Sequence, residues 1–418
     1  MNPATPRRAF PAFVARSFAL SALVLAIAAP GAHAADPKEV KVAIVVPLSG
    51  PWARNGELHL KGAQLAVDQI NAAGGIKALG GAKMKLVIGD AGDSTEKAKN
   101  AMQRIVSQND DLTGGTGAFV SSFTLAVTEI SERAELPWLT LSYSDQITNR
   151  GYKYVFQTSP TAGKQSADAL PVLLEVARHG NAATPKTIGI VMDNTASPAS
   201  FTKPMREGGF DKLGLKLVVE ETFTPPLSDA TSLVQKVRTA RPDLLLVLTT
   251  NVPDTKLVLE KLNEMGLGKG RLPVLTNGGH MGSPELLQVV GKDLLEGVMV
   301  AIANWGGKGQ EELIKTFRAK TSEPWMTQDS ISTYGDIQIF KDAIELAGSA
   351  DPKKVAAAMR TMDMTDGAAR YFPGKHLKFD ASGRRADAGL VVLQWQGGEP
   401  KPVFPTVLAT ATPVWPKR

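Results

Sequence analysis

Short apolar runs alternate with amphipathic segments along the chain from Val40 onward. Residues 40–46 are rich in β-branched side chains and predict a strand, and the apolar positions between Ala63 and Ile70 then repeat with the spacing of one helix face. Further strands are predicted at 84–88, 136–141, 187–192, 215–219, 244–248, 272–275 and 297–302, and further helices at 98–106, 121–135, 165–178, 201–213, 254–265 and from Ser283. Repeated strand–helix units predict an α/β fold whose parallel sheets are covered by helices on both faces.

The last part of the chain has a different pattern. Helices are predicted at 311–318 and 331–347, and a third begins at Asp351-Pro352 and runs to Met362. The chain then closes with an expected hairpin that joins residues 377–379 to 390–396 through the turn at 380–383. The two sets of strand–helix units are similar in size and lack a flexible linker, so the pattern predicts two lobes with a cleft between them.

The turns that follow the predicted strands are rich in hydroxyl groups, amides and glycine. In open parallel sheets, ligands bind beyond the carboxyl ends of the strands, where helix N-termini also offer free N–H groups. The turns concerned are 49–55, 117–124, 142–145, 193–200, 249–254 and 277–281. Their composition predicts a site for a small polar solute.

The composition is that of a globular protein, and the N-terminal residues resemble an export signal. Hydrophobic residues make up 43% and charged residues 21% of the chain, which excludes a disordered protein and a multi-span membrane protein. Residues 1–34 combine three arginines, a short apolar stretch and Ala32-His33-Ala34, which is typical of a secretory signal peptide. Export through the Sec route is expected, with twin-arginine export as the alternative.

The net charge and the lack of cysteine exclude several kinds of partner and site. Removal of residues 1–34 takes away three arginines and no acid, which lowers the formal charge from +6 to +3. This excess is too small to indicate nucleic acid as a partner. Without cysteine the chain has no disulfide, thiolate metal site or lipidated N-terminus. A periplasmic location is therefore expected.

No constellation of residues indicates an enzyme. The five histidines are isolated, no HExxH or GxSxG motif occurs, and residues 114–117 lack the full dinucleotide-binding fingerprint. No catalytic residue, cofactor or metal is therefore expected.

Four segments carry a resemblance to a known family. They are VKVAIVVPLSGPWARNGELHLKGAQLAVDQINAAGGI at 40–76 and the stretches at 130–140, 148–158 and 334–359. The chain resembles the Leu/Ile/Val-binding type of periplasmic solute-binding protein from ABC importers. The resemblance implies the type I periplasmic-binding-protein fold, with two Rossmann-like lobes joined by a three-segment hinge near Gln157, Asn304 and Leu377. Lobe 1 is expected to comprise 35–157 and 304–377, and lobe 2 to comprise 158–303 and 378–418.

The resemblance also implies the partners. A small-molecule solute would bind in the cleft by hinge closure, and an inner-membrane ABC permease would receive it. A monomer is expected. A sensory ligand-binding protein of the same fold remains the alternative, as does branched-chain amino-acid binding proper.

In the first lobe, the resemblance assigns two hydroxyl loops to a ligand carboxylate. The loops contain Ser121 and Ser122 and then Ser142, Tyr143 and Ser144. Ser121 and Ser122 are also good candidates for the N-cap of the following helix. Trp52 is expected to stack on the solute or to serve as a partly buried anchor.

In the second lobe the chain departs from the family pattern. Ser197 stands where an aromatic residue is common, and Asn277-Gly278 replaces the acid that pairs with an α-ammonium group. Asn251 and Asn277 are candidate amide donors, or ordinary turn residues. Asp329 is expected to cap the helix that begins near Ile331 and is left out of the site, with supply of the missing charge from the first lobe as the alternative. The solute predicted from these residues is a small carboxylate or amide, either amino-acid-like or an aromatic acid, ahead of a free branched-chain amino acid.

Overall fold

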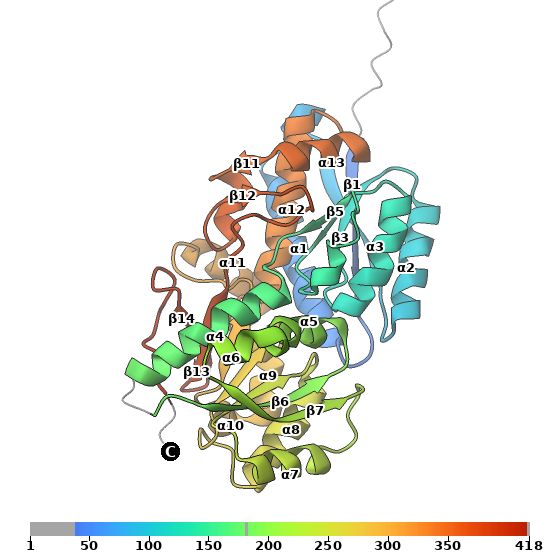
Figure 1. Cartoon of the computed structure of the whole chain (residues 1–418). Helices are drawn as coiled ribbons and strands as arrows, with labels where there is room; N and C mark the ends of the chain where they lie inside the picture. The colour runs from blue at the N-terminus through green and yellow to red at the C-terminus, as the bar shows by residue number, and fades with distance from the viewer. Residues whose placement is uncertain (1–37, 180–182, 416–418) are drawn as a thin grey trace, which may run out of the picture. The chain divides into compact units, whose positions relative to one another are not determined.

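The computed structural model describes residues 38–179 and 183–415, which belong to one compact unit, Asp36–Arg418. The predicted signal peptide at 1–34 lies outside the described residues. Within this unit the strands form two large sheets and one small two-stranded sheet (Figure 1).

The first large sheet is wholly parallel and has the strand order β2-β1-β3-β4-β5. Its strands are β1 (Glu39–Val46), β2 (Lys83–Asp90), β3 (Leu112–Gly117), β4 (Trp138–Thr140) and β5 (Val155–Gln157). One face packs on α1 (Ala53–Ala72), α12 (Gln328–Ala347) and α13 (Pro352–Thr361), and the other on α2 (Thr95–Gln108) and α3 (Ser121–Arg133) (Figure 1). Alternate residues of β1 are buried on opposite faces, which explains its unbroken apolar run.

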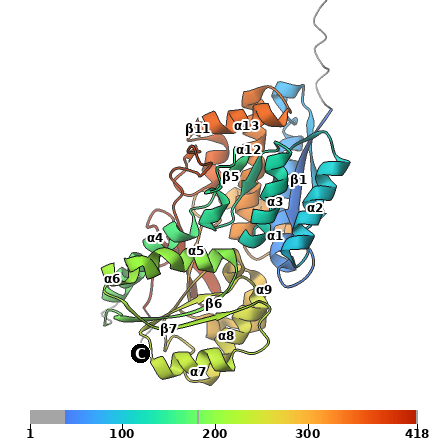
Figure 2. The same ribbon diagram turned by 45° about the vertical axis from the view of Figure 1, so that its right-hand side comes forward.

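The second large sheet has the order β14-β13-β10-β9-β8-β6-β7. Its parallel strands are β6 (Thr187–Asp193), β7 (Lys216–Phe223), β8 (Leu244–Leu248), β9 (Val274–Asn277) and β10 (Met299–Ile302). β13 (Val391–Gln396) is antiparallel to β10, and β14 (Glu399–Phe404) is antiparallel to β13. Figure 2 shows α4 (Ala162–His179), α5 (Ala196–Pro204) and α6 (Phe210–Lys212) on one face. The other face carries α7 (Thr231–Ala240), α8 (Val252–Glu264), α9 (Pro284–Val290) and α10 (Lys292–Leu295).

The chain passes between the two sheets three times. The passages are 158–161 after β5, 303–310 between β10 and α11 (Glu311–Thr321), and 379–390 after β12 (Leu377–Lys378). The first and third passages are joined by backbone hydrogen bonds, in which Gln157 N donates to Gly383 O at 2.8 Å and Arg385 N donates to Gln157 O at 2.9 Å. The buried Arg385 guanidinium also donates to Thr158 O at 2.9 Å. The first and third connecting segments are therefore held side by side by hydrogen bonds.

The hairpin predicted near the C-terminus is wrong. β12 pairs with β11 (Asp363–Met364), whereas β13 pairs with β10 and turns through Gly397-Gly398 into β14. An apolar run identifies a strand but not its partner, because the pairing is decided by long-range packing.

Two short strands of the first sheet, β3 and β5, were not predicted. β3 has the sequence LTGGTG, and glycine is poor in strands. Here the glycines make room for large neighbours, since a Cβ at Gly114 would lie 2.2 Å from the Phe340 ring and one at Gly115 2.4 Å from Trp138. The glycines of β3 therefore allow Phe340 and Trp138 to pack closely against the sheet.

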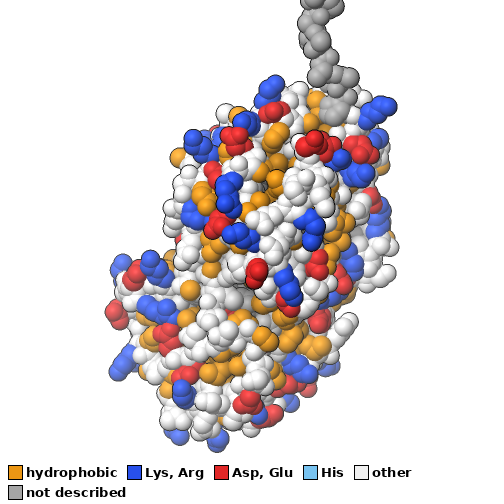
Figure 3. All heavy atoms as spheres, turned by 90° about the vertical axis from the view of Figure 1, so that its right-hand side faces the viewer, with side chains coloured by type: hydrophobic (Ala, Val, Ile, Leu, Met, Phe, Trp, Pro, Cys, Tyr) orange, Lys and Arg blue, Asp and Glu red, His pale blue; other side chains and the backbone are white. Residues whose placement is uncertain are grey.

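For the residues described, neither the surface charge nor the helices indicate a membrane-spanning protein. On the face drawn in Figure 3, basic and acidic side chains are interspersed. None of the helices in the described ranges is both long enough and apolar enough to cross a bilayer.

The packing of β3 gives a stability prediction. Gly114→Ala should destabilise the protein by about 1–3 kcal/mol, because the added methyl group collides with Phe340 in a filled core. Gly389→Ala is the control, since no heavy atom lies within 4 Å of its Cβ position. Urea unfolding of both variants measures the difference, and equal stability of the two variants would contradict the packing account.

Candidate functional site

The candidate site is a cavity at the carboxyl ends of strands from both large sheets. It is lined by the turns after β3, β4, β8 and β9 and by the first turns of α5 and α12. The lining residues are Phe119, Val120, Ser121, Leu141, Ser142, Tyr143, Ser197, Thr249, Thr250, Asn277, Gly278, Gly279, His280, Gln328 and Asp329. The cavity volume is about 50 Å³, which exceeds the roughly 10–15 Å³ that one water needs. There is room for several waters or part of a small solute.

Ser121 joins the two hydroxyl loops. β3 ends at Gly117, whose φ of +106° and close approach to Val45 O require glycine, and α3 begins at Ser121. Ser121 Oγ accepts hydrogen bonds from Tyr143 N at 3.2 Å and Ser144 N at 3.1 Å. The N-cap position belongs to Val120, which makes no side-chain cap bond, so the capping interpretation of Ser121 and Ser122 is wrong. The Ser121 hydroxyl therefore still has a proton to donate.

The other predicted serines of the first lobe hold the loops in place. Ser142 Oγ lies within 3.0 Å of four oxygens, including Ala118 O at 2.8 Å and Phe119 O at 2.9 Å. Ser144 Oγ accepts from Gln146 N and contacts Ser200 Oγ at 2.9 Å. Ser122 Oγ accepts from Ala196 N at 3.3 Å, which links α3 to α5. Of these three, only Ser142 lines the cavity.

The two predicted aromatic residues lie in different places. Tyr143 lines the cavity, and its hydroxyl donates to Gln328 Oε1 at 2.5 Å. Trp52 is buried with α2 and α3 and packs edge-on against Phe123, with ring centroids 5.3 Å apart. Trp52 is therefore a core anchor outside the cavity lining, whereas Phe119, which was not predicted, contributes an aromatic face.

The second wall contains Ser197 and Asn277 but not Asn251. Asn251 caps α8, since its Oδ1 accepts from Asp254 N at 2.9 Å and its Nδ2 donates to Asp254 Oδ2 at 2.7 Å. Asn277 ends β9, and its buried Nδ2 has no hydrogen-bond partner within the described residues. An unsatisfied buried donor costs about 1–3 kcal/mol. Asn277 is therefore poised to donate to an acceptor in the cavity.

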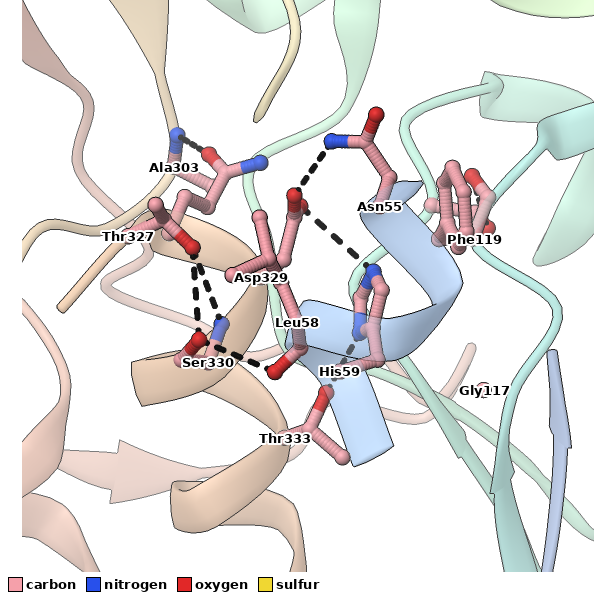
Figure 4. A network of polar contacts seen from close by, with 12 residues as sticks. Asn55, Leu58, His59, Gly117, Phe119, Ala303, Thr327, Asp329, Ser330 and Thr333 are labelled. Atoms are coloured by element: carbon pink, nitrogen blue, oxygen red, sulfur yellow. Dashed lines mark hydrogen bonds and ion pairs between the residues drawn. The ribbon is translucent and has the colours of Figure 1, made fainter. Parts of the chain in front are cut away.

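Asp329 is the main functional candidate that the sequence interpretation left out of the site. The predicted role as a helix cap is wrong, because α12 begins at Gln328 and is capped by Thr327 Oγ. Asp329 is buried in the first turn of α12, lines the cavity and accepts a hydrogen bond from Asn55 Nδ2 at 2.6 Å (Figure 4). Burial raises the pKa of its carboxyl to about 7, although hydrogen bonds from Asn55 and Gln328 act in the opposite direction.

The nearest basic side chain to Asp329 is an uncharged histidine. His59 Nε2 lies 3.4 Å from Asp329 Oδ1, and His59 Nδ1 lies 2.5 Å from Thr333 Oγ1 (Figure 4). The ring stacks on Phe119 with centroids 4.5 Å apart. Burial lowers the pKa of His59 to about 3, so His59 is neutral at physiological pH and does not balance the carboxylate charge.

Gly279 brings the second wall directly against Asp329. A Cβ at position 279 would lie 2.1 Å from Asp329 Oδ1, so Asp329 occupies the space that a side chain from this turn would need. From the sequence, this turn was interpreted as lacking the acid that pairs with an α-ammonium group. The structure shows that a carboxyl group on α12 reaches the same turn.

The raised pKa of Asp329 gives a pH prediction. The folded protein binds this proton more tightly than the unfolded chain, so its stabilising effect is complete below about pH 4 and is lost as the pH rises through about 7. The Asp329→Asn variant has no titratable group at this position. The stability of the wild type relative to Asp329→Asn should therefore fall between pH 4 and 7 by at least about 1 kcal/mol.

Denaturant unfolding of both proteins across this pH range measures the difference. The neutral His59 and His280, whose pKa values burial lowers to about 3, act in the opposite direction but are present in both proteins. A constant difference across the range would show that Asp329 is ionised in the folded protein with an ordinary pKa.

Comparisons with known proteins agree on one family. The family model described as periplasmic binding protein matches residues 39–399. The Leu/Ile/Val-binding protein homolog 8 of Brucella melitensis is 29% identical over 385 residues, which cover 89% of this chain and 92% of the relative.

Two solved structures show the same fold. The substrate-binding protein LivJ of Streptococcus pneumoniae, in complex with isoleucine, has a TM-score of 0.73 at 20% identity and covers 87% of this chain and 97% of its own. A solute-binding protein of an ABC transporter from R. palustris, in complex with benzoate, has a TM-score of 0.74 at 16% identity. The match covers 91% of this chain and 100% of that structure's chain. The mixed α/β architecture and the family match confirm the type I fold predicted from the sequence. The chain belongs to the periplasmic binding protein family.

Proposed function

We propose that the protein is the periplasmic solute-binding component of an ABC importer and delivers its solute to an inner-membrane permease. The observation that carries the proposal is the cavity in which turns from both large sheets face each other. The family match and the substrate-binding proteins among the relatives support it. Export by the signal peptide at 1–34 and a monomeric state are part of this proposal.

The proposed mechanism is closure of two lobes over the solute. Residues 35–157 and 304–377 would form one lobe, and 158–303 and 378–418 the other, with the three passages between the sheets as the hinge. A solute that contacts both walls favours the closed state by the contacts that exist only there. Within the protein, the two walls meet where Ala196 N donates to Ser122 Oγ and where Gly279 lies against Asp329.

The proposed solute is a small molecule with a carboxylate or an amide. The Ser121 hydroxyl, the uncapped N-terminus of α3 and the unpaired Asn277 amide are all donors at the cavity, and they suit an acceptor group. The ligands named for the similar proteins, isoleucine and benzoate, both carry a carboxylate. Ser142 and Tyr143 would support this wall, and Ser197 would border the solute from the second lobe. Trp52, Ser144 and Asn251 lie outside the cavity lining and are not included.

Calorimetry with a defined panel tests this function. Leucine, 4-methylpentanoate, benzoate and benzamide are titrated into the mature protein, and at least one carboxylate or amide should bind. Ser121→Ala should weaken that binding by about tenfold or more, because a hydrogen bond to a charged group is worth about 1.5–3 kcal/mol.

Ser131→Ala is the matched control for this experiment. Ser131 is buried in the same helix, its hydroxyl donates to Thr128 O at 3.3 Å, and it does not line the cavity, so loss of this hydroxyl should leave the affinity unchanged. Absence of binding by the whole panel at millimolar concentration, or wild-type affinity of Ser121→Ala, would contradict the proposed solute class.

A further inference from the structure

Two tryptophans hold η4 (Gly279–Gly282), the short helix that follows β9 and whose first two residues line the cavity. Trp325, in the loop between α11 and α12, donates its indole N–H to Gly282 O at 2.7 Å. The ring of Trp305, in the passage 303–310, fills the space beside the same residue, since a Cβ at Gly282 would lie 2.5 Å from it. The last residue of η4 is therefore fixed by side chains from outside the second sheet.

The loop that carries Trp325 faces two different cores. Met326 is 1% exposed and belongs to the core between the first sheet, α1 and α12. The Trp325 ring instead packs against the core between the second sheet and α7 to α10, with its centroid 6.1 Å from that of Trp395. Because adjacent residues of one loop are built into the cores of both sheets, Trp325 ties the two halves of the molecule directly together.

This tie lies against one of the segments that connect the two sheets. Ala303 N, at the start of the passage 303–310, donates to Gln328 Oε1 at 2.7 Å, and a Cβ at Gly306 would lie 3.0 Å from Met326 O. The passage thus contacts the loop of Trp325 on one side and η4 on the other. In a hinge motion the connecting segments absorb the change of angle, and displacement grows with distance from them. Trp325 is therefore placed where a rotation of the lobes moves atoms least.

A second contact between the two halves lies on the opposite faces of both sheets. It is the hydrogen bond of 3.3 Å from Ala196 N in α5 to Ser122 Oγ in α3. In the first sheet α3 covers the face opposite to α12 (Figure 1). In the second sheet α5 covers the face opposite to α9 (Figure 2). A rotation about the passage 303–310 would therefore keep the tie at Trp325 and separate α3 from α5.

We infer that Trp325 is the pivot of the lobe motion: it keeps η4 attached to the loop before α12 in the open and in the closed protein, so that the solute enters between α3 and α5. This inference rests on the proposed closure of two lobes and specifies where the lobes stay in contact. Trp325 is thereby a positioning residue, because η4 carries Gly279 and His280 of the cavity lining. Both are held against α12 before a solute binds.

Distance measurements on the two sides of the cavity test the pivot. The chain has no cysteine, so introduced cysteine pairs carry spin labels at the chosen sites alone. Ala319→Cys on α11 with Gln288→Cys on α9 reports the side of Trp325, and Glu129→Cys on α3 with Ala199→Cys on α5 reports the other side; all four residues are exposed. Double electron–electron resonance gives the distance distribution of each pair, without solute and with each member of the calorimetry panel.

The two pairs should behave differently. Without solute, the α11–α9 pair should give one narrow distance, because the tie at Trp325 is intact. The α3–α5 pair should give a broader distribution that shortens when a panel member binds. Replacing the pivot should broaden the α11–α9 distribution in the free protein: Trp325→Phe removes the hydrogen bond to Gly282, and Trp325→Ala also removes the packing and should broaden it further.

Trp395→Phe is the matched control. Trp395 of β13 donates its indole N–H to Met281 O at 2.8 Å, so its substitution removes the same kind of hydrogen bond from the neighbouring carbonyl of η4. This bond lies wholly within the second sheet's half of the molecule, so its loss should leave both distributions unchanged. A thermal melt of each variant checks that it is folded, and the comparison of the two pairs in the wild type needs no variant of the pivot.

The outcomes separate the inference from the proposed mechanism. If the α11–α9 distribution is as broad as the α3–α5 distribution, shortens with it on binding, or is unchanged in both Trp325 variants, the inference is overturned while lobe closure stands. If both pairs give equally narrow distances that no panel member changes, closure of two lobes and the inference both fail.

Discussion

A buried carboxyl group at the meeting point of the two walls constrains the whole site. Asp329 enters from the first turn of α12, is held by Asn55 of α1, and lies against Gly279 of the opposite wall. Burying this charge without a partner is costly, which raises the pKa of the carboxyl group to about 7. The space that Asp329 occupies also requires a glycine at position 279.

The fold serves to bring the strand ends of two sheets together. Each sheet is built from strand–helix units, so its turns carry helix N-termini, hydroxyls and amides at one edge. The polar side chains of these turns have two different roles. Ser142, Ser144 and Asn251 satisfy backbone groups and fix the loops, whereas Ser121, Asn277 and Asp329 retain unused hydrogen-bonding or charge capacity at the cavity. Unused capacity, rather than residue type, distinguishes the candidate ligand contacts.

Local patterns predicted most of the architecture but only part of the site. Apolar periodicity located β1, β8 and the main helices because burial on both faces leaves a direct trace in the sequence. It failed for β3, where glycines accommodate Phe340 and Trp138, and for the partner of β13. Trp52 lies in the turn after β1, which does not line the cavity, and its ring packs in the core. Asp329 was left out of the expected site because its contacts are with α1 and the 278–279 turn, which are distant in sequence.

The most direct test of this account is the pKa of Asp329 itself, measured from its carboxyl ¹³C shift by NMR with Asp329→Asn for assignment. The account predicts a pKa near 7, because burial disfavours the ionised carboxyl group. A pKa near 4 would contradict it.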